Sequence, residues 1–142
     1  MIAVDTNVLV YAHRPELAKH GIARRVLTDL AEDPAPWAVP VFCLGEFLRV
    51  LTHPRIFDPP LAAGEACEAL GRVLQSPSVR VLIPGEAYTD LLLRAVNEAE
   101  ATGNVVFDAQ IVALCRESGV TALVTEDRDF ARFRGFAIRR LK

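Results

Sequence analysis

The chain has 142 residues, of which 51% are hydrophobic and 24% are charged, and its formal net charge at pH 7 is −2. This balance excludes a disordered chain, and it argues against a general nucleic-acid-binding protein that relies on excess positive charge. The length suits one globular domain over residues 1–142. No apolar run approaches the roughly 18 residues that a membrane helix needs. The N-terminus also lacks the pattern of a signal peptide, so we expect a cytoplasmic protein with no membrane segment.

The first ten residues, MIAVDTNVLV, introduce the pattern that organises the chain. Residues 2–4 form a short apolar run, which predicts a strand buried on both faces. Asp5, Thr6 and Asn7 follow at once, and their side chains favour turns and helix N-caps. A helix is predicted over residues 6–13. Because ligand crevices in open α/β sheets lie beyond the carboxyl ends of the strands, Asp5 is a candidate site residue.

Strands and helices alternate along the rest of the sequence. Further strands are expected at residues 37–39, 79–83, 120–124 and 136–138. Further helices are expected from Pro15-Glu16 to a stop at Asp33-Pro34, over residues 41–51, 61–74 and 87–101, from a cap at Asn104 to Glu117, and over residues 128–133. This alternation predicts a parallel sheet with right-handed crossovers. We expect a three-layer α/β/α domain around a central parallel sheet of about five strands.

The helix predicted over residues 41–51 is apolar nearly all round, which is typical of a buried helix. Glu46 lies in its middle. An ionised carboxylate in that position is costly unless it is paired or bound to a cation. Glu46 therefore pairs with Arg49, reaches solvent at the edge of the helix, or points into a polar pocket.

Two more acids stand in similar surroundings. Asp108 falls inside an apolar helical pattern, a turn too late to cap a helix that begins at Asn104. A later start would make Asp108 an ordinary N-cap. Asp127 follows the strand at residues 120–124 in the sequence TEDRDF, an arrangement like that at Asp5. Asp127 is either an N-cap for the next helix or a second acid at the same sheet edge.

The cysteines and the basic residues carry weaker signals. Cys43, Cys67 and Cys115 are widely spaced among apolar residues, so we expect buried free thiols rather than disulfides or a zinc site. Basic residues gather near both ends of the chain, as solvated faces or as a footprint for an RNA backbone. The candidates for RNA binding are Arg14, Arg128, Arg132, Arg139 and Arg140.

In a doubly wound sheet, helix starts and the carboxyl ends of strands lie on one side. Four acids can therefore meet there, namely Asp5, Glu46, Asp108 and Asp127. Carboxylates in contact repel one another and are partly protonated unless a cation compensates. All-oxygen ligation selects Mg²⁺ or Mn²⁺ over zinc. Such ions orient phosphodiesters and activate water, so the pattern predicts phosphate-ester hydrolysis without a covalent intermediate.

Four segments in order resemble the PIN-domain family and, more narrowly, the VapC toxins of bacterial toxin–antitoxin pairs. They are IAVDTNVLVYA, CLGEFLRVLTHPRIF, VFDAQIVALC and LVTEDRDF. The resemblance implies a Mg²⁺- or Mn²⁺-dependent endoribonuclease, usually a homodimer, that cuts transfer or ribosomal RNA. It also implies a VapB-type antitoxin, which often inserts an arginine into the acidic site, and a strand order of 3-2-1-4-5.

The same resemblance assigns roles to individual residues. It implies that the catalytic and metal-binding acids are Asp5, Glu46 and Asp108, with Asp127 as a more variable fourth. The secondary site candidates are Asp129 as a neighbouring acid and Thr6, Asn7 and Thr125 as supporting polar residues.

Three other functions compete with this interpretation. A phosphatase of the haloacid-dehalogenase type needs a second aspartate two residues after the first, where Asn7 stands. A response-regulator receiver domain needs an aspartate at the end of its third strand, where the sequence is VLIPG. Such a domain also needs a lysine before the last strand, where residues 133–135 read FRG. A non-catalytic domain that binds a metal or a partner is the third alternative.

Overall fold

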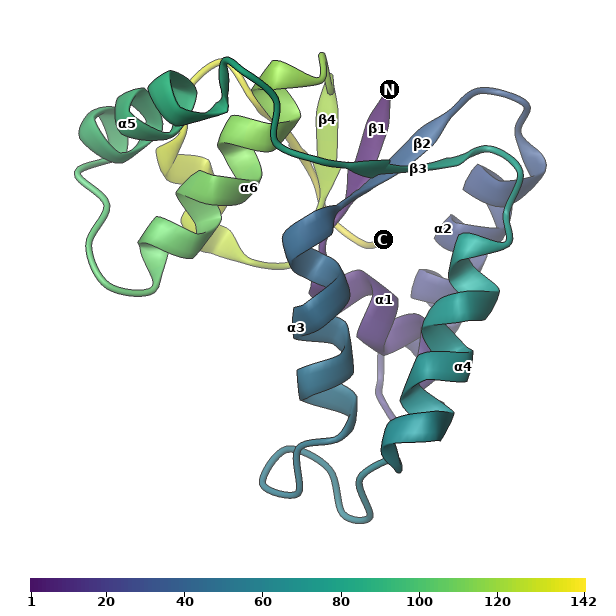
Figure 1. The fold of residues 1–142 in the computed structure, drawn as a ribbon. Coiled ribbons are helices and arrows are strands. Elements are labelled where there is room, and N and C mark those ends of the chain that lie inside the picture. The colour runs from purple at the N-terminus through teal and green to yellow at the C-terminus, as the bar shows by residue number, and fades with distance from the viewer.

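The computed structural model describes residues 1–142 and contains a five-stranded, fully parallel sheet (Figure 1). The strands are β1 (Ile2–Val4), β2 (Trp37–Pro40), β3 (Val79–Leu82), β4 (Ala122–Val124) and β5 (Ala137–Arg139). Their order across the sheet is β3-β2-β1-β4-β5, which confirms the order that the family resemblance implies. β1 is the central strand, and it pairs with both β2 and β4.

Six α-helices and one 3₁₀ helix connect the strands. They are α1 (Thr6–His13), α2 (His20–Glu32), α3 (Val41–Leu51), α4 (Ala63–Leu74), α5 (Tyr88–Ala99), α6 (Val105–Glu117) and η1 (Arg128–Arg132). Figure 1 shows α5 and α6 standing apart from the group formed by α1, α2, α3 and α4. This separation follows from right-handed crossovers, because the chain runs one way across the sheet from β1 to β3 and then returns. None of the helices is long and apolar enough to cross a membrane.

The hydrophobic core is centred on the three middle strands. Ala3, Val4, Val39 and Leu123 are fully buried. Strands that are covered on both faces read as continuous apolar runs, which is why these short segments are recognisable in the sequence. The core thus fixes the positions at which β1 and β4 end, and the polar residues that follow them are held in place.

Several predicted boundaries were wrong. α2 begins at His20 rather than at Pro15-Glu16. The intervening residues form turns instead, in which the Leu17 N–H donates to the Arg14 carbonyl at 3.1 Å. The other predicted elements match the structure or differ from it by one or two residues at an end. β5 lies at residues 137–139 because Ala137 pairs with Ala122 of β4.

Two burial predictions were also wrong. α3 is not buried all round, because only Cys43, Phe47 and Leu51 are buried while Glu46 is exposed. Cys67 is exposed, although it is free like the other two cysteines, which are buried. α3 packs on the core through one buried stripe of residues, so its other residues lie at the surface of the protein, and Glu46 is one of them.

Replacement of a core residue of α3 tests this packing. Phe47 is fully buried, and its ring lies edge-on to His13 at a centroid distance of 6.3 Å. Phe47→Ala is expected to lower the free energy of unfolding by about 3–5 kcal/mol, because it removes apolar contacts and leaves a cavity. Urea denaturation measures the change. Leu93→Ala on α5 is the matched control, since the Leu93 side chain is 57% exposed and its loss costs little. Equal losses in the two variants would contradict the packing described.

Candidate functional site

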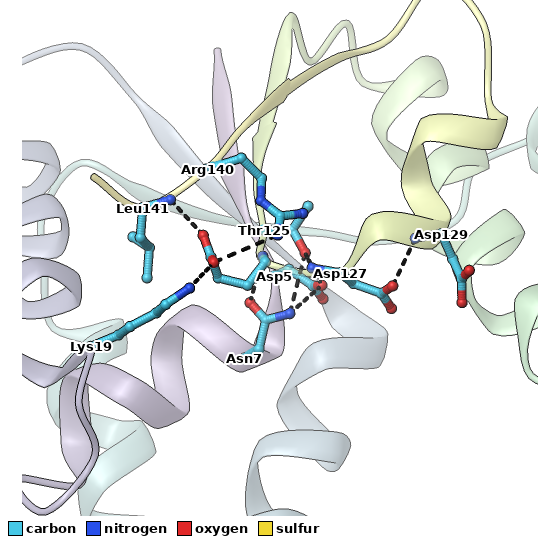
Figure 2. A network of polar contacts seen from close by, with 9 residues as sticks. Asp5, Asn7, Lys19, Thr125, Asp127, Asp129, Arg140 and Leu141 are labelled. Atoms are coloured by element: carbon cyan, nitrogen blue, oxygen red, sulfur yellow. Dashed lines mark hydrogen bonds and ion pairs between the residues drawn. The ribbon is translucent and has the colours of Figure 1, made fainter.

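Asp5 follows β1 directly and is buried, with an exposed fraction of 5%. It is the N-cap of α1, and its Oδ1 accepts a hydrogen bond from the Thr6 backbone N–H at 2.8 Å. The Thr125 hydroxyl donates to Asp5 Oδ2 at 2.7 Å (Figure 2). The Cys43 thiol lies 3.7 Å from Asp5 Oδ1. The carboxylate is therefore held by donors from the start of α1, from α3 and from the end of β4.

The strand ends beneath these contacts are fixed by backbone hydrogen bonds. The Asp5 N–H donates to the Val124 carbonyl, and the Thr125 N–H donates to the Arg139 carbonyl, each at 3.0 Å. The sheet hydrogen bonding thus continues one residue beyond β1 and β4. Asp5 and Thr125 meet because each is the first residue after a buried parallel strand.

Asn7 joins the end of β1 to the loop after β4. Its amide nitrogen lies 3.3 Å from Asp5 Oδ2 and 3.2 Å from the Thr125 hydroxyl oxygen. Its amide oxygen accepts the Glu126 N–H at 3.3 Å, and the Thr125 hydroxyl oxygen accepts the Asp127 N–H at 3.0 Å. The polar residues that surround Asp5 therefore also orient the loop that carries Asp127, as Figure 2 shows.

Three aspartates from two segments form a cluster. Side-chain oxygens of Asp108, Asp127 and Asp129 lie within 4.8 Å of one another. Asp127 is also the N-cap of η1, since its Oδ1 accepts the Asp129 N–H at 2.9 Å. The capping role predicted as an alternative for Asp127 is thus present, yet it engages only one of the two carboxylate oxygens. Asp127 and Asp129 both belong to the cluster.

Asp108 is the fourth residue of α6, so the helix begins before it and Asp108 is not its N-cap. Asn104 occupies the N-cap position with helical backbone angles and makes no side-chain capping bond. The prediction that a helix starting at Asn104 leaves Asp108 without a capping role is confirmed. Asp108 is half-buried instead, beside the loop that follows β4.

A cleft of about 700 Å³ lies over this cluster, and we call it the acidic cleft. Its walls come from α3, from α6 and from the loop after β4. The lining includes Glu46, Asp108, Asp127 and Asp129 among eleven residues. Asp5 is buried and does not line the cleft. The structure therefore brings Glu46 into the cleft with the aspartates, as one of the predicted alternatives states.

Burial raises the pKa of Asp108 from 3.8 to about 7. Negative charges add to this effect, and in order of size they are those of Asp127, Asp5, Asp129 and Glu46. Burial also raises the pKa of Asp5, with smaller increases from Glu46 and Asp127, against hydrogen bonds from Thr125 and Thr6 that lower it. The surroundings of Asp108 and Asp5 therefore oppose the ionisation of these two acids.

The donor set suits a hard divalent cation. Carboxylate oxygens are the ligands that such ions prefer. The protein has four ion pairs, and none of them includes one of these five acids. No ion pair of the chain therefore offsets the carboxylate repulsion that adds to the effect of burial on the pKa of Asp108, and a bound cation would relieve that repulsion.

Glu126 is a sixth acid near the site, but its surroundings are different. Its side chain is only 8% exposed and forms ion pairs with Lys19 and with Arg140, the second at 3.7 Å. The Leu141 N–H donates to its Oε1 at 2.6 Å (Figure 2). Burial acts to raise the pKa of Glu126, but the Lys19 hydrogen bond, the Leu141 N–H and the two cations lower it overall. Glu126 is thus a structural ion pair rather than a member of the acidic cluster.

None of the arginines predicted to bind RNA lines the acidic cleft. Arg14 pairs with Glu16 at 2.5 Å, and its guanidinium lies 4.1 Å from the centre of the Phe57 ring. Arg140 pairs with Glu126. The other three, Arg128, Arg132 and Arg139, are exposed. The cleft lining instead includes Arg49 and Phe107, which the sequence analysis did not select as site residues. Their positions in the sequence could have identified them, because Arg49 stands three residues after Glu46 and Phe107 stands directly before Asp108.

Comparison with known proteins agrees with this geometry. The family model for the PIN domain matches residues 2–135. Ribonuclease VapC43 of Mycobacterium tuberculosis is 39% identical over 134 residues, covering 94% of this chain and 90% of the relative. Ribonuclease VapC25 of the same organism is 35% identical over 133 residues, with 94% and 93% coverage.

Solved structures share the fold at lower identity. The crystal structure of VapBC2 from Rickettsia felis, bound to a DNA fragment from its promoter, matches with a TM-score of 0.75, 18% identity and full coverage of both chains. That of Mycobacterium tuberculosis VapC20, a toxin that cleaves the sarcin–ricin loop, matches with a TM-score of 0.69 and 22% identity over 95% of this chain and 98% of that one. The match to the PIN-domain model and the 39% identity to VapC43 show that the chain belongs to the PIN-domain family, among the VapC ribonucleases.

Proposed function

We propose that this chain is a metal-dependent endoribonuclease and the toxin of a toxin–antitoxin pair. The observation that carries the proposal is the convergence of Asp108, Asp127 and Asp129, with Glu46 beside them, in a cleft over buried Asp5. None of these acids forms an ion pair within the chain. Curated relatives at 39% and 35% identity carry the name ribonuclease. RNA is the proposed substrate, transfer or ribosomal RNA by the family resemblance.

The residues proposed to hold Mg²⁺ or Mn²⁺ are Asp5, Glu46, Asp108 and Asp127, with Asp129 as a neighbouring acid. When bound, such an ion orients a phosphodiester, lowers the pKa of a water molecule and stabilises the leaving oxygen. The chain's part is to supply oxygen ligands in a fixed arrangement. Thr125 and Asn7 do this for Asp5 through their hydrogen bonds to Oδ2 at 2.7 and 3.3 Å.

The same residues do not support the alternative function, that of a phosphatase of the haloacid-dehalogenase type. That class needs a second carboxylate two residues after the first. Asn7 stands there, and its amide is engaged by Asp5, Thr125 and the Glu126 N–H. Asn7 therefore acts as a support for Asp5 rather than as an acid or base.

The proposed partners follow from the same family. A VapB-type antitoxin is the proposed inhibitor, since cleft acids that form no ion pair within the chain favour an inserted arginine. A homodimer is the proposed assembly, and the cytoplasm is the proposed location. The VapBC2 structure from Rickettsia felis is of such a toxin–antitoxin pair on its promoter DNA.

Cleavage of total bacterial RNA by the purified chain tests the assignment. With Mn²⁺ we expect discrete fragments, and with chelator we expect none. Asp5→Asn is expected to abolish cleavage while the chain stays folded, because it removes a charge and keeps the side-chain shape. Asp90→Asn is the matched control, since Asp90 is an exposed acid of α5 outside the cleft. Full activity of Asp5→Asn would remove Asp5 from the catalytic set.

The outcomes of that assay separate the ribonuclease from a non-catalytic binding domain. If no condition gives fragments while Mn²⁺ still raises the melting temperature of the wild type, the chain binds metal without cutting the RNA supplied. Sequencing of the fragment ends, where they form, identifies the cleaved RNA.

The raised pKa of Asp108 predicts how stability depends on pH when chelator is present. Its pKa rises from 3.8 to about 7 on folding. Between these values the folded state keeps a proton that the unfolded chain has lost, so rising pH destabilises the fold until about pH 7. Asp108→Asn removes this contribution. From about pH 5 to about pH 8, the melting temperature of the wild type should fall further than that of the variant.

Addition of Mn²⁺ is expected to reduce the wild-type fall, because the ion stabilises the ionised carboxylates in the folded state. Differential scanning fluorimetry over the same pH range measures both effects. Parallel pH profiles for the wild type and Asp108→Asn in chelator would contradict the electrostatic account of the cluster.

A further inference from the structure

Phe107 is an exposed aromatic residue inside the acidic cleft. It is the third residue of α6, directly before Asp108, and its side chain is 62% exposed. Single exposed apolar side chains are common on protein surfaces. Leu93 and Ile83 are of this kind, since they are exposed and lie outside the cleft lining. Phe107 differs because it lies among the acids proposed to act on RNA.

The other aromatic residue of the cleft, Phe42, already has a packing partner. Its ring lies 6.1 Å from that of Tyr88 at an angle of 45°, and it is only partly exposed. Phe107 takes part in none of the aromatic contacts of the protein. Its ring therefore remains free to pack on a flat group that enters the cleft.

Arg49 is the one basic residue that lines the cleft. It projects from α3, whereas Phe107 projects from α6, so the two come from different walls. Arg49 is exposed and takes part in no ion pair with a carboxylate of the chain. The acids of the cleft repel a phosphate that carries no cation, and a free guanidinium beside them offsets that repulsion.

We propose that Phe107 and Arg49 together hold an unpaired nucleotide of the RNA substrate beside the acidic cluster. The Phe107 ring stacks on the base, and the Arg49 guanidinium binds a neighbouring phosphate. Proteins that bind single-stranded nucleic acid combine these two contacts, and stacking tolerates any base because every base has a flat face. The proposal rests on the ribonuclease function given above and assigns the positioning of the substrate to these two residues; the stacking contact requires the bound nucleotide to be unpaired.

The requirement follows from the geometry of base pairing. A base inside a duplex is stacked on both faces by its neighbours, so Phe107 cannot pack on it without first breaking that stack. An unpaired base in a loop or single strand presents a free face. Phe107 therefore favours single-stranded over double-stranded RNA, whereas Arg49 contacts the phosphate backbone of either form.

Binding to a defined RNA tests the proposal in the Asp5→Asn background with Mn²⁺, where the RNA is not cut. The probes are a fluorescently labelled single strand of mixed sequence and the same strand annealed to its complement, followed by anisotropy. Phe107→Ala is expected to weaken single-strand binding by about 5- to 100-fold, the loss of one stacked base. Duplex binding should not change, and Phe107→Trp should restore single-strand binding.

Arg49→Ala is expected to weaken binding of both probes and to lower the slope of log affinity against log salt by about 1, as one phosphate contact is lost. The matched controls are Leu93→Ala and Arg94→Ala, which alter exposed residues of α5 outside the cleft. Both controls should bind the two probes as the parent does. In the wild-type background, Phe107→Ala should raise KM for cleavage more than it lowers kcat.

Two results would overturn the proposal while leaving the ribonuclease assignment intact. One is equal single-strand affinity for the parent and Phe107→Ala when the parent binds well. The other is a change of oligomeric state in Phe107→Ala by analytical ultracentrifugation, which would make the residue a subunit contact. Absence of RNA binding by the parent together with absence of cleavage by the wild type would overturn the assignment and this proposal together.

Discussion

Repulsion among carboxylates at one edge of a parallel sheet is the constraint on which this structure depends. The fold brings Asp5 to this edge because it follows β1, and the loop with Asp127 because it follows β4. Each carboxylate oxygen of Asp5 is met by a donor, and the pKa of Asp108 rises to about 7. The site thus holds its acids in a fixed arrangement in which burial and mutual repulsion oppose the ionisation of Asp108.

Much of this arrangement was predictable from the sequence. An apolar run followed at once by Asp5, Thr6 and Asn7 identifies both a buried strand and the residues at its end. The same pattern before Asp127 identifies the neighbouring strand. Spacing alone did not give the order of the strands, which came from the likeness to a known family. Residues that are neighbours in the sequence therefore identify where a strand ends, but they say much less about which strand lies next to it in the sheet.

The features that were missed depend on contacts between distant segments. Cys67 was predicted to be a buried thiol, but it is exposed on α4. The apolar sequence of α3 suggested complete burial, yet the helix packs by one stripe and gives its other side to the cleft. A residue's neighbours on other elements decide such cases, and one sequence does not contain that information.

The Glu126 side chain connects three parts of the chain that lie far apart in sequence. It accepts the Leu141 N–H and pairs with Lys19 and Arg140, while its backbone N–H is held by Asn7. A carboxylate with so little exposure is tolerated only with its cations. Positions 19, 126 and 140 should therefore covary among related sequences: where 126 is apolar or neutral, the selective pressure for basic residues at the other two positions disappears.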